Sequence, residues 1–135
     1  MRPTHVLETV LYAEDLDAIK DFYADVLGLQ PFSAMPDRQV FYKLDAQMLL
    51  IFNPQATAVP PAPGALPVPP HGSHGPGHVC FSACAGDLDR LRQHLADKGI
   101  AVDADFEWPQ GGRSIYFRDP AGNSIEFAEP RIWGL

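Results

Sequence analysis

The sequence has few cysteines, and this restricts how the chain is stabilised. Only two of its 135 residues are cysteine, Cys80 and Cys84. If the segment that holds them is a strand, they lie about 13 Å apart, which is too far for a disulfide. Two cysteines that cannot pair fit a reducing compartment, and we expect a cytoplasmic protein.

Basic residues and long apolar segments are also scarce. Lysine and arginine number 10 against 17 aspartates and glutamates, which gives a net charge of −7. Binding to phosphate groups needs a basic surface, so the charge argues against nucleic acid and anionic membranes as partners. The opening residues "MRPTHVLETV" contain no long apolar segment. We therefore expect neither a signal peptide nor a membrane span.

Proline and glycine, in contrast, are concentrated in one stretch. Residues 57–77 read "TAVPPAPGALPVPPHGSHGPG". This composition excludes a helix or a central strand and predicts a semi-rigid, partly polyproline linker. The rest of the chain is apolar enough, with 46% hydrophobic residues overall, to form a core without disulfides.

The segment before the linker predicts a strand, a helix and further strands. Asp15 is a suitable N-cap for the helix, its apolar positions repeat at helical spacing, and Gly28 ends it. The apolar stripe consists of Leu16, Ile19, Phe22, Tyr23 and Val26. The predicted strands cover residues 5–13, about 29–34, 38–45 and 47–54.

The segment after the linker repeats this order. Leu88, Leu91 and Leu95 form the inward stripe of a helix over 86–100, with Gly99 as its stop, and "DLD" occurs in both helices. The predicted strands cover residues 77–85, about 100–105, 113–119 and 123–130. The repeat predicts an α+β fold of two βαβββ modules. Residues 4–56 form the first module, 57–75 the linker and 76–130 the second, within one domain over 5–130.

Two segments resemble a known family. "EDLDAIKDFYADVLGL" (14–29) and "YFRDPAGNSIEF" (116–127) resemble the vicinal oxygen chelate superfamily. This superfamily includes glyoxalase I, the fosfomycin- and bleomycin-resistance proteins and the extradiol dioxygenases. The resemblance implies two modules whose curved mixed sheets face each other around a cavity, with a metal ion between them where one is bound.

The resemblance also implies a ligand set. The first family ligand lies seven positions before Asp15, which gives Glu8, and the others correspond to His78 and Glu126. His5 is then out of register and points to the opposite face. The fourth position of glyoxalase I falls on Leu49 or Leu50, neither of which binds metal.

Two carboxylates and an imidazole form a hard, open site for a divalent ion: Fe, Mn, Ni, Zn or Mg. Each ligand has a structural alternative, because Glu8 and Glu126 could alternate toward solvent and His78 could be a hydrogen-bonded core histidine. Their matching places in the two halves favour the metal site. His71 and His74, within the linker, are not expected to be ligands and should face solvent.

Three more residues are candidates for substrate binding. Ser114 and Tyr116 are two residues apart on one predicted strand and therefore share a face. They correspond to polar residues that face the substrate in fosfomycin-resistance proteins, although a buried tyrosine with a satisfied hydroxyl is an alternative. Arg113, near Trp108 in the preceding loop, could hold a substrate carboxylate or be an ordinary surface arginine.

Two functions remain open from the sequence. The first is a metal-dependent lyase, isomerase or dioxygenase that binds a small oxygenated molecule through two of its oxygens, with Glu8 or Glu126 as the base. The second is a metal-free binding protein of the bleomycin-resistance type. Family members are commonly homodimers, so a homodimer with a small-molecule partner is expected in either case.

Overall fold

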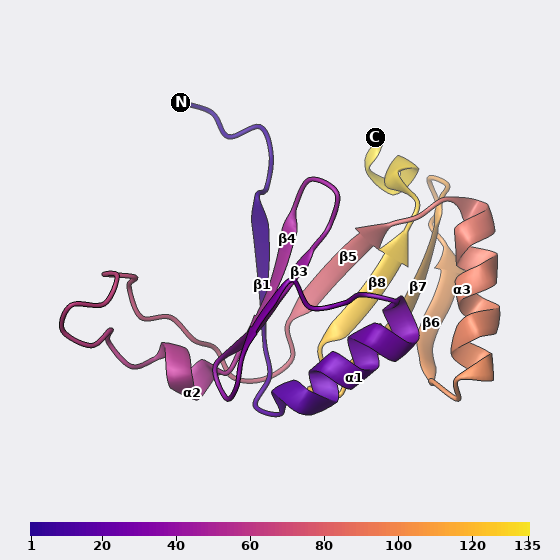
Figure 1. The fold of residues 1–135 in the computed structure, drawn as a ribbon. Coiled ribbons are helices and arrows are strands. Elements are labelled where there is room, and N and C mark those ends of the chain that lie inside the picture. The colour runs from indigo at the N-terminus through magenta and orange to yellow at the C-terminus, as the bar shows by residue number, and fades with distance from the viewer. The chain divides into compact units, whose positions relative to one another are not determined.

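The computed structural model describes residues 1–135 and divides the chain into two compact units, Met1–Pro76 and Gly77–Leu135 (Figure 1). The first contains β1 (Glu8–Tyr12), α1 (Leu16–Leu27), β2 (Ser33–Met35), β3 (Gln39–Lys43), β4 (Met48–Phe52) and α2 (Pro54–Thr57). The second contains β5 (His78–Ser82), α3 (Ala85–Asp97), β6 (Val102–Glu107), β7 (Arg113–Arg118), β8 (Ser124–Ala128) and the 3₁₀ helix η1 (Pro130–Trp133).

Each unit is built on one four-stranded mixed sheet. The strand order is β1-β4-β3-β2 in the first unit and β5-β8-β7-β6 in the second. In each, the first strand runs parallel to the fourth, and the remaining pairs are antiparallel. The strand–helix–three-strand order therefore occurs twice, which confirms the predicted α+β fold of two βαβββ modules.

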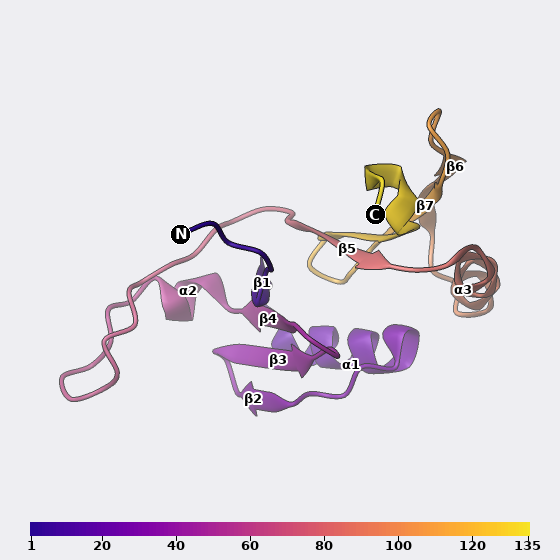
Figure 2. The same ribbon diagram turned by 90° about the horizontal axis from the view of Figure 1, so that it is seen from above.

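The helix of the first unit begins and ends where the sequence predicts. The Asp15 carboxylate accepts a hydrogen bond from the Ala18 N–H at 2.9 Å, and Gly28 ends the helix at φ +67°. α1 lies along one face of its sheet (Figure 2) and buries Tyr23, which stacks on Tyr42 of β3 with ring centroids 5.2 Å apart. This helix covers one face of the sheet and leaves the other face uncovered.

The helix of the second unit follows the same plan. α3 packs against β7, with Leu88 and Leu95 fully buried, and Gly99 follows it at φ +69°. Both cysteines are free thiols, which agrees with the prediction that they form no disulfide. No helix in the structure combines the length and the apolar character needed to span a bilayer.

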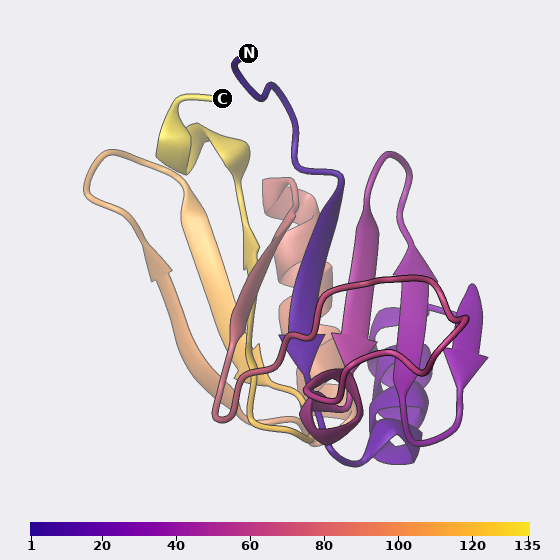
Figure 3. The ribbon, with the colours of Figure 1, turned by 90° about the vertical axis from the view of Figure 1, so that its left-hand side faces the viewer.

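The proline-rich segment is a closed loop at one end of the first unit (Figure 3). The N–H of His71 donates to the carbonyl of Thr57 at 3.0 Å and so joins the two ends of the loop. The His71 ring contacts two residues of the sheet: Nδ1 lies 2.7 Å from the Tyr12 hydroxyl, and the ring packs edge-on against Phe52. The expected solvent-facing role is therefore wrong for His71, whereas His74 is exposed.

A buried polar turn links β7 to β8 in the second unit. The Asp119 carboxylate accepts hydrogen bonds from the N–H of Ala121 and of Asn123. The Asn123 amide donates to Asp119 and accepts from the Gly77 N–H, each at about 2.8 to 2.9 Å. Because Gly77 precedes β5, this turn fixes the start of the strand that carries His78.

Candidate functional site

The second unit carries a polar cluster on the sheet face that its helix leaves uncovered. Strand register pairs Glu126 of β8 with Cys80 of β5 and with Tyr116 of β7. Paired residues share a face of a sheet, and alternation adds His78, two residues before Cys80. Glu126 is only 5% exposed, so its carboxylate is held among these side chains.

The imidazole of His78 and the carboxylate of Glu126 contact each other. His78 Nε2 lies 3.2 Å from Glu126 Oε2, and His78 Nδ1 lies 3.0 Å from the Ser124 carbonyl oxygen. A carbonyl can only accept, so Nδ1 carries the hydrogen, and in the neutral ring Nε2 is then an acceptor. Two acceptors facing each other need a proton on one of them or a metal ion between them.

The other oxygen of Glu126 supports a metal ion. Glu126 Oε1 is buried and accepts no hydrogen bond of good geometry, although the Cys80 thiol and the Tyr116 hydroxyl lie close enough to Glu126 for it to raise the pKa of both groups. Such poor satisfaction is unfavourable for a charged group. Metal ligands lie about 2.0 to 2.2 Å from an ion, so two donors 3.2 Å apart can share one. This pair therefore fits a divalent ion, although no group of three or more His, Cys, Asp or Glu side chains is assembled for a metal anywhere in the structure.

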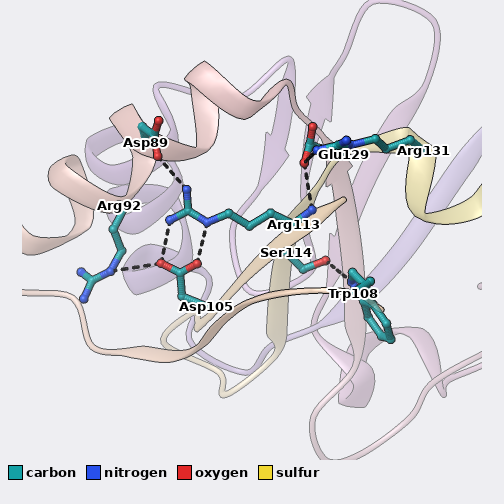
Figure 4. Close-up of polar contacts among 8 residues, drawn as sticks. All are labelled: Asp89, Arg92, Asp105, Trp108, Arg113, Ser114, Glu129 and Arg131. Atoms are coloured by element: carbon teal, nitrogen blue, oxygen red, sulfur yellow. Dashed lines mark hydrogen bonds and ion pairs between the residues drawn. The ribbon is translucent and has the colours of Figure 1, made fainter. Parts of the chain in front are cut away.

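Aromatic rings and hydroxyls surround the pair. Tyr116 stacks between His78 and Phe106, at centroid distances of 6.2 and 6.0 Å. Partial burial and the neighbouring Glu126 carboxylate raise the pKa of Tyr116 to about 12, so its hydroxyl keeps its proton at neutral pH. Figure 4 shows Trp108 reaching Ser114, whose hydroxyl accepts from the indole N–H at 2.8 Å. Ser114 is fully buried, and its hydroxyl can donate to the Tyr116 oxygen, a contact that partly offsets the rise in the Tyr116 pKa.

Cys80 belongs to the same cluster, as its pairing with Glu126 requires. Partial burial and Glu126 raise the pKa of the Cys80 thiol to about 12, so it is a neutral thiol and not a thiolate. The donor pair of this face is His78 and Glu126, because these two side chains contact each other.

Arg113 is engaged elsewhere. Its guanidinium forms a two-pronged pair with Asp105, at 2.7 and 2.8 Å, and a third bond with Asp89 of α3 at 2.6 Å (Figure 4). Arg113 precedes Ser114, so alternation turns it toward the helix and away from the cluster. A substrate carboxylate would have to displace one of these two aspartates, which argues against the predicted role of Arg113 in substrate binding.

This ion-pair network predicts a pH-dependent stability. Arg113 holds the pKa of Asp105 below its usual value, so the stabilisation is present above the unfolded pKa and is lost as pH falls through the folded one. Arg113→Met should lower the free energy of unfolding by about 1 to 2 kcal/mol at pH 7 and by much less near pH 3. Urea unfolding at both pH values measures this.

Arg90→Met is the matched control, because Arg90 pairs with Asp87 on the open surface of α3, the helix that also carries Asp89. Exposed ion pairs contribute little to the free energy of unfolding, so this variant should unfold like the wild type at both pH values. If Arg113→Met lost the same free energy of unfolding at pH 7 and at pH 3, the ion pair with Asp105 would not be the source of the stabilisation.

The loop that holds Trp108 depends on two glycines. Gly111 and Gly112 lie at φ +94° and +90°, and the Trp108 N–H donates to the Gly112 carbonyl. A Cβ at Gly112 would lie 2.5 Å from the side chain of Ile132, whereas a Cβ at Gly111 would have nothing within 4 Å. An alanine at either position would therefore be strained in its backbone, but only at Gly112 would its Cβ also clash with a neighbouring side chain.

Gly112→Ala should accordingly destabilise the protein more than Gly111→Ala. Backbone strain is worth about 1 to 2 kcal/mol at each site, and the clash adds about 1 to 3 kcal/mol at Gly112 only. Thermal unfolding of both variants gives the difference. Identical midpoints would show that Ile132 moves aside without cost.

In the first unit, Glu8 starts β1 and is exposed. Leu11 of the same strand is buried against the helix, so Glu8, Val10 and Tyr12 alternate onto the uncovered face. Register pairs Val10 with Leu50, which places Leu50 on the Glu8 face and Leu49 on the core face. Of the two leucines that the sequence leaves open for the fourth family position, Leu50 is the one that shares the face of Glu8. His5 lies before the strand and contacts only the Thr4 hydroxyl.

Comparison with known proteins agrees with the fold described above. Residues 3–127 match the model of the Glyoxalase/Bleomycin resistance protein/Dioxygenase superfamily. The chain belongs to this superfamily. The vicinal oxygen chelate resemblance read from the sequence is thereby confirmed. No protein among those with curated functions matches the chain.

Solved structures of the superfamily share this fold. Lactoylglutathione lyase from Agrobacterium tumefaciens is 42% identical, with a TM-score of 0.94 and full coverage of both chains. A glyoxalase/bleomycin resistance protein/dioxygenase from Nocardioides is 24% identical, with a TM-score of 0.73, over 96% of this chain and 84% of that one. A glyoxalase/bleomycin resistance protein from Catenulispora acidiphila is 20% identical, with a TM-score of 0.64, over 93% and 98%. At these low identities, the similarity to the last two structures shows the fold alone.

Proposed function

We propose that this protein is a metal-dependent enzyme of the glyoxalase/dioxygenase type that acts on a small oxygenated molecule. Its metal ligands are Glu8, His78 and Glu126. The observation that carries the proposal is the pair of His78 Nε2 and Glu126 Oε2, 3.2 Å apart, beside a buried carboxylate oxygen that accepts no hydrogen bond of good geometry. A divalent ion would satisfy both groups.

Glu8 is proposed as the third ligand from the family pattern. It begins β1 as His78 begins β5, on the uncovered face of its own sheet. Two carboxylates and a neutral imidazole reduce the charge of a divalent ion to about zero, and Fe, Mn, Ni, Zn and Mg all accept this set. With Leu50 at the fourth position, the remaining coordination positions are open to two oxygens of a substrate.

The bound ion would supply Lewis-acid stabilisation of negative charge on the substrate oxygens. The protein supplies the rest. Of the two hydroxyls assigned to the substrate site, that of Tyr116 donates a hydrogen bond to a substrate oxygen. The buried Ser114, which accepts from the Trp108 N–H, orients Tyr116. Glu8 or Glu126 accepts a proton from the carbon next to that oxygen.

The 42% identical Agrobacterium protein makes lactoylglutathione lyase the first activity to assay. Metal-loaded protein should form lactoylglutathione, activity should disappear with a chelator, and one of the five metals should restore it. Activity that survives complete metal removal would refute a metal-dependent mechanism. Failure to form lactoylglutathione would exclude this reaction. Metal binding would then be measured separately.

A metal-free binding protein is the second candidate. It is favoured by Leu50, a buried apolar residue beside Val10 at the place where the resemblance to glyoxalase I implies a fourth ligand. Such a protein would hold a planar molecule without converting it. It would bind no stoichiometric metal, so metal content separates the two candidates.

We also propose a cytoplasmic homodimer with modules 4–56 and 76–130 joined by residues 57–75, and with no nucleic-acid or membrane partner. Exposed apolar side chains support the dimer, because Phe32, Trp133 and Leu135 are each at least 66% exposed. Light scattering at micromolar concentration should give about twice the chain mass of 14.8 kDa. A mass equal to one chain would refute the dimer.

A further inference from the structure

The proline-rich loop forms the wall of a pocket that the proposed reaction does not use. The pocket has a volume of about 480 Å³ and lies entirely within the first unit. It is bounded by the loop, by the turn between β2 and β3, and by α2. This volume falls within the range of small-molecule sites, roughly 300 to 1,000 Å³.

Prolines and backbone hydrogen bonds restrict the wall of the pocket. Six of the 13 residues in 58–70 are proline, which limits the backbone freedom that binding would otherwise have to remove. The His71-to-Thr57 hydrogen bond closes the loop, and a turn joins the Ala65 N–H to the Ala62 carbonyl at 3.0 Å. Gly72 lies against Pro54, where a Cβ would come within 3.1 Å of its carbonyl oxygen.

The lining of the pocket is mostly apolar and open to solvent. Val59, Leu66 and Val68 of the loop are 63%, 81% and 56% exposed, and Met35 on the opposite side is 52% exposed. Burying such side chains is favourable in proportion to the area removed from water. An apolar group of a ligand would cover them.

One cation lies in this apolar lining. Arg38 is half-buried and makes one side-chain hydrogen bond, from Nη1 to the Ala56 carbonyl at 3.0 Å. No carboxylate pairs with it, although the chain has 17 acidic residues. The remaining N–H groups of its guanidinium suit the two oxygens of a carboxylate.

We propose that this pocket binds a small amphipathic carboxylate, with its carboxylate on Arg38 and its apolar body against Leu66, Val68 and Met35. The charge of Arg38 selects the anion, and the apolar wall selects the hydrocarbon. The site is separate from the cluster around Glu126 and does not depend on the proposed reaction.

Calorimetric titration of the full chain tests this with octanoate, hexanoate and 1-octanol. Octanoate should bind at one site per chain, and hexanoate should bind on the order of tenfold more weakly because it lacks two methylenes. Arg38→Gln should weaken octanoate about 10- to 100-fold and leave the weaker binding of 1-octanol unchanged. Leu66→Ser should weaken both ligands.

Glu126→Gln is the control for the other site and should bind octanoate like the wild type, with circular dichroism as the folding control for each variant. The proposal is overturned if octanoate does not bind, or if Arg38→Gln binds it as tightly as the wild type. It is equally overturned if Leu66→Ser dissociates a dimer and octanoate does not change the oligomeric state of the wild type. A second copy of the chain would then cover this wall.

Discussion

His78→Ala and Glu126→Ala should each lower metal affinity by more than about 100-fold, since losing a group that merely supports a ligand already costs roughly 10- to 100-fold. The reason is geometric: each variant removes one of the two donors that lie 3.2 Å apart and leaves the other alone. Glu8→Ala should have a similar effect if it is the third ligand. Elemental analysis of protein purified without chelator or affinity-tag nickel measures the metal per chain.

His71→Ala and His74→Ala are the matched controls, because both histidines belong to the same stretch as His78. His74 is exposed, and the ring of His71 is bonded to Tyr12 in the first unit. Both variants should keep the metal content of the wild type, with circular dichroism confirming the fold. Metal loss in these two, with retention in His78→Ala, would overturn the ligand set.

Asn123→Ala should lower the free energy of unfolding by about 3 kcal/mol, because buried donors and acceptors that lose their partners are expensive. The Asn123 side chain is 1% exposed and bridges the Gly77 N–H and the Asp119 carboxylate. Alanine would leave the Gly77 N–H without its bond and would loosen the turn before Glu126 and the start of β5 together.

Urea unfolding measures this loss, and Asn53→Ala is the comparison. Asn53 also accepts a backbone N–H through its side chain, from Gln55, but as the N-cap of the four-residue α2. Its loss should be about 1 kcal/mol or less. Equal changes for the two variants would show that the Asp119–Asn123 turn does not hold the second sheet together.

The fold could be predicted because local signals agree with the global pattern. Asp15 and Gly28 cap a helix whose apolar residues repeat at helical spacing, and the same order recurs after residue 77. The proline-rich loop could not be foreseen. Its composition predicts an extended chain, whereas its path is set by tertiary contacts of His71 with Tyr12, Phe52 and Thr57.

The candidate site was partly predictable for the same reason. Strand alternation places Ser114 and Tyr116 on the same face. The same alternation places Arg113, the residue before Ser114, on the opposite face, and the sequence interpretation missed this signal. The family pattern brought His78 and Glu126 forward as ligands. The Trp108 bond to Ser114 had no such signal, because it depends on the conformation of a glycine-containing loop.

The most direct test of the proposed metal centre is a crystal of the full chain grown with Mn²⁺ and examined by anomalous diffraction. We expect one strong anomalous peak per chain, within about 2.2 Å of Glu8, His78 and Glu126 side-chain atoms. A fully occupied peak on other residues, or no peak in crystals grown at saturating Mn²⁺, would contradict the metal-dependent function proposed for this protein.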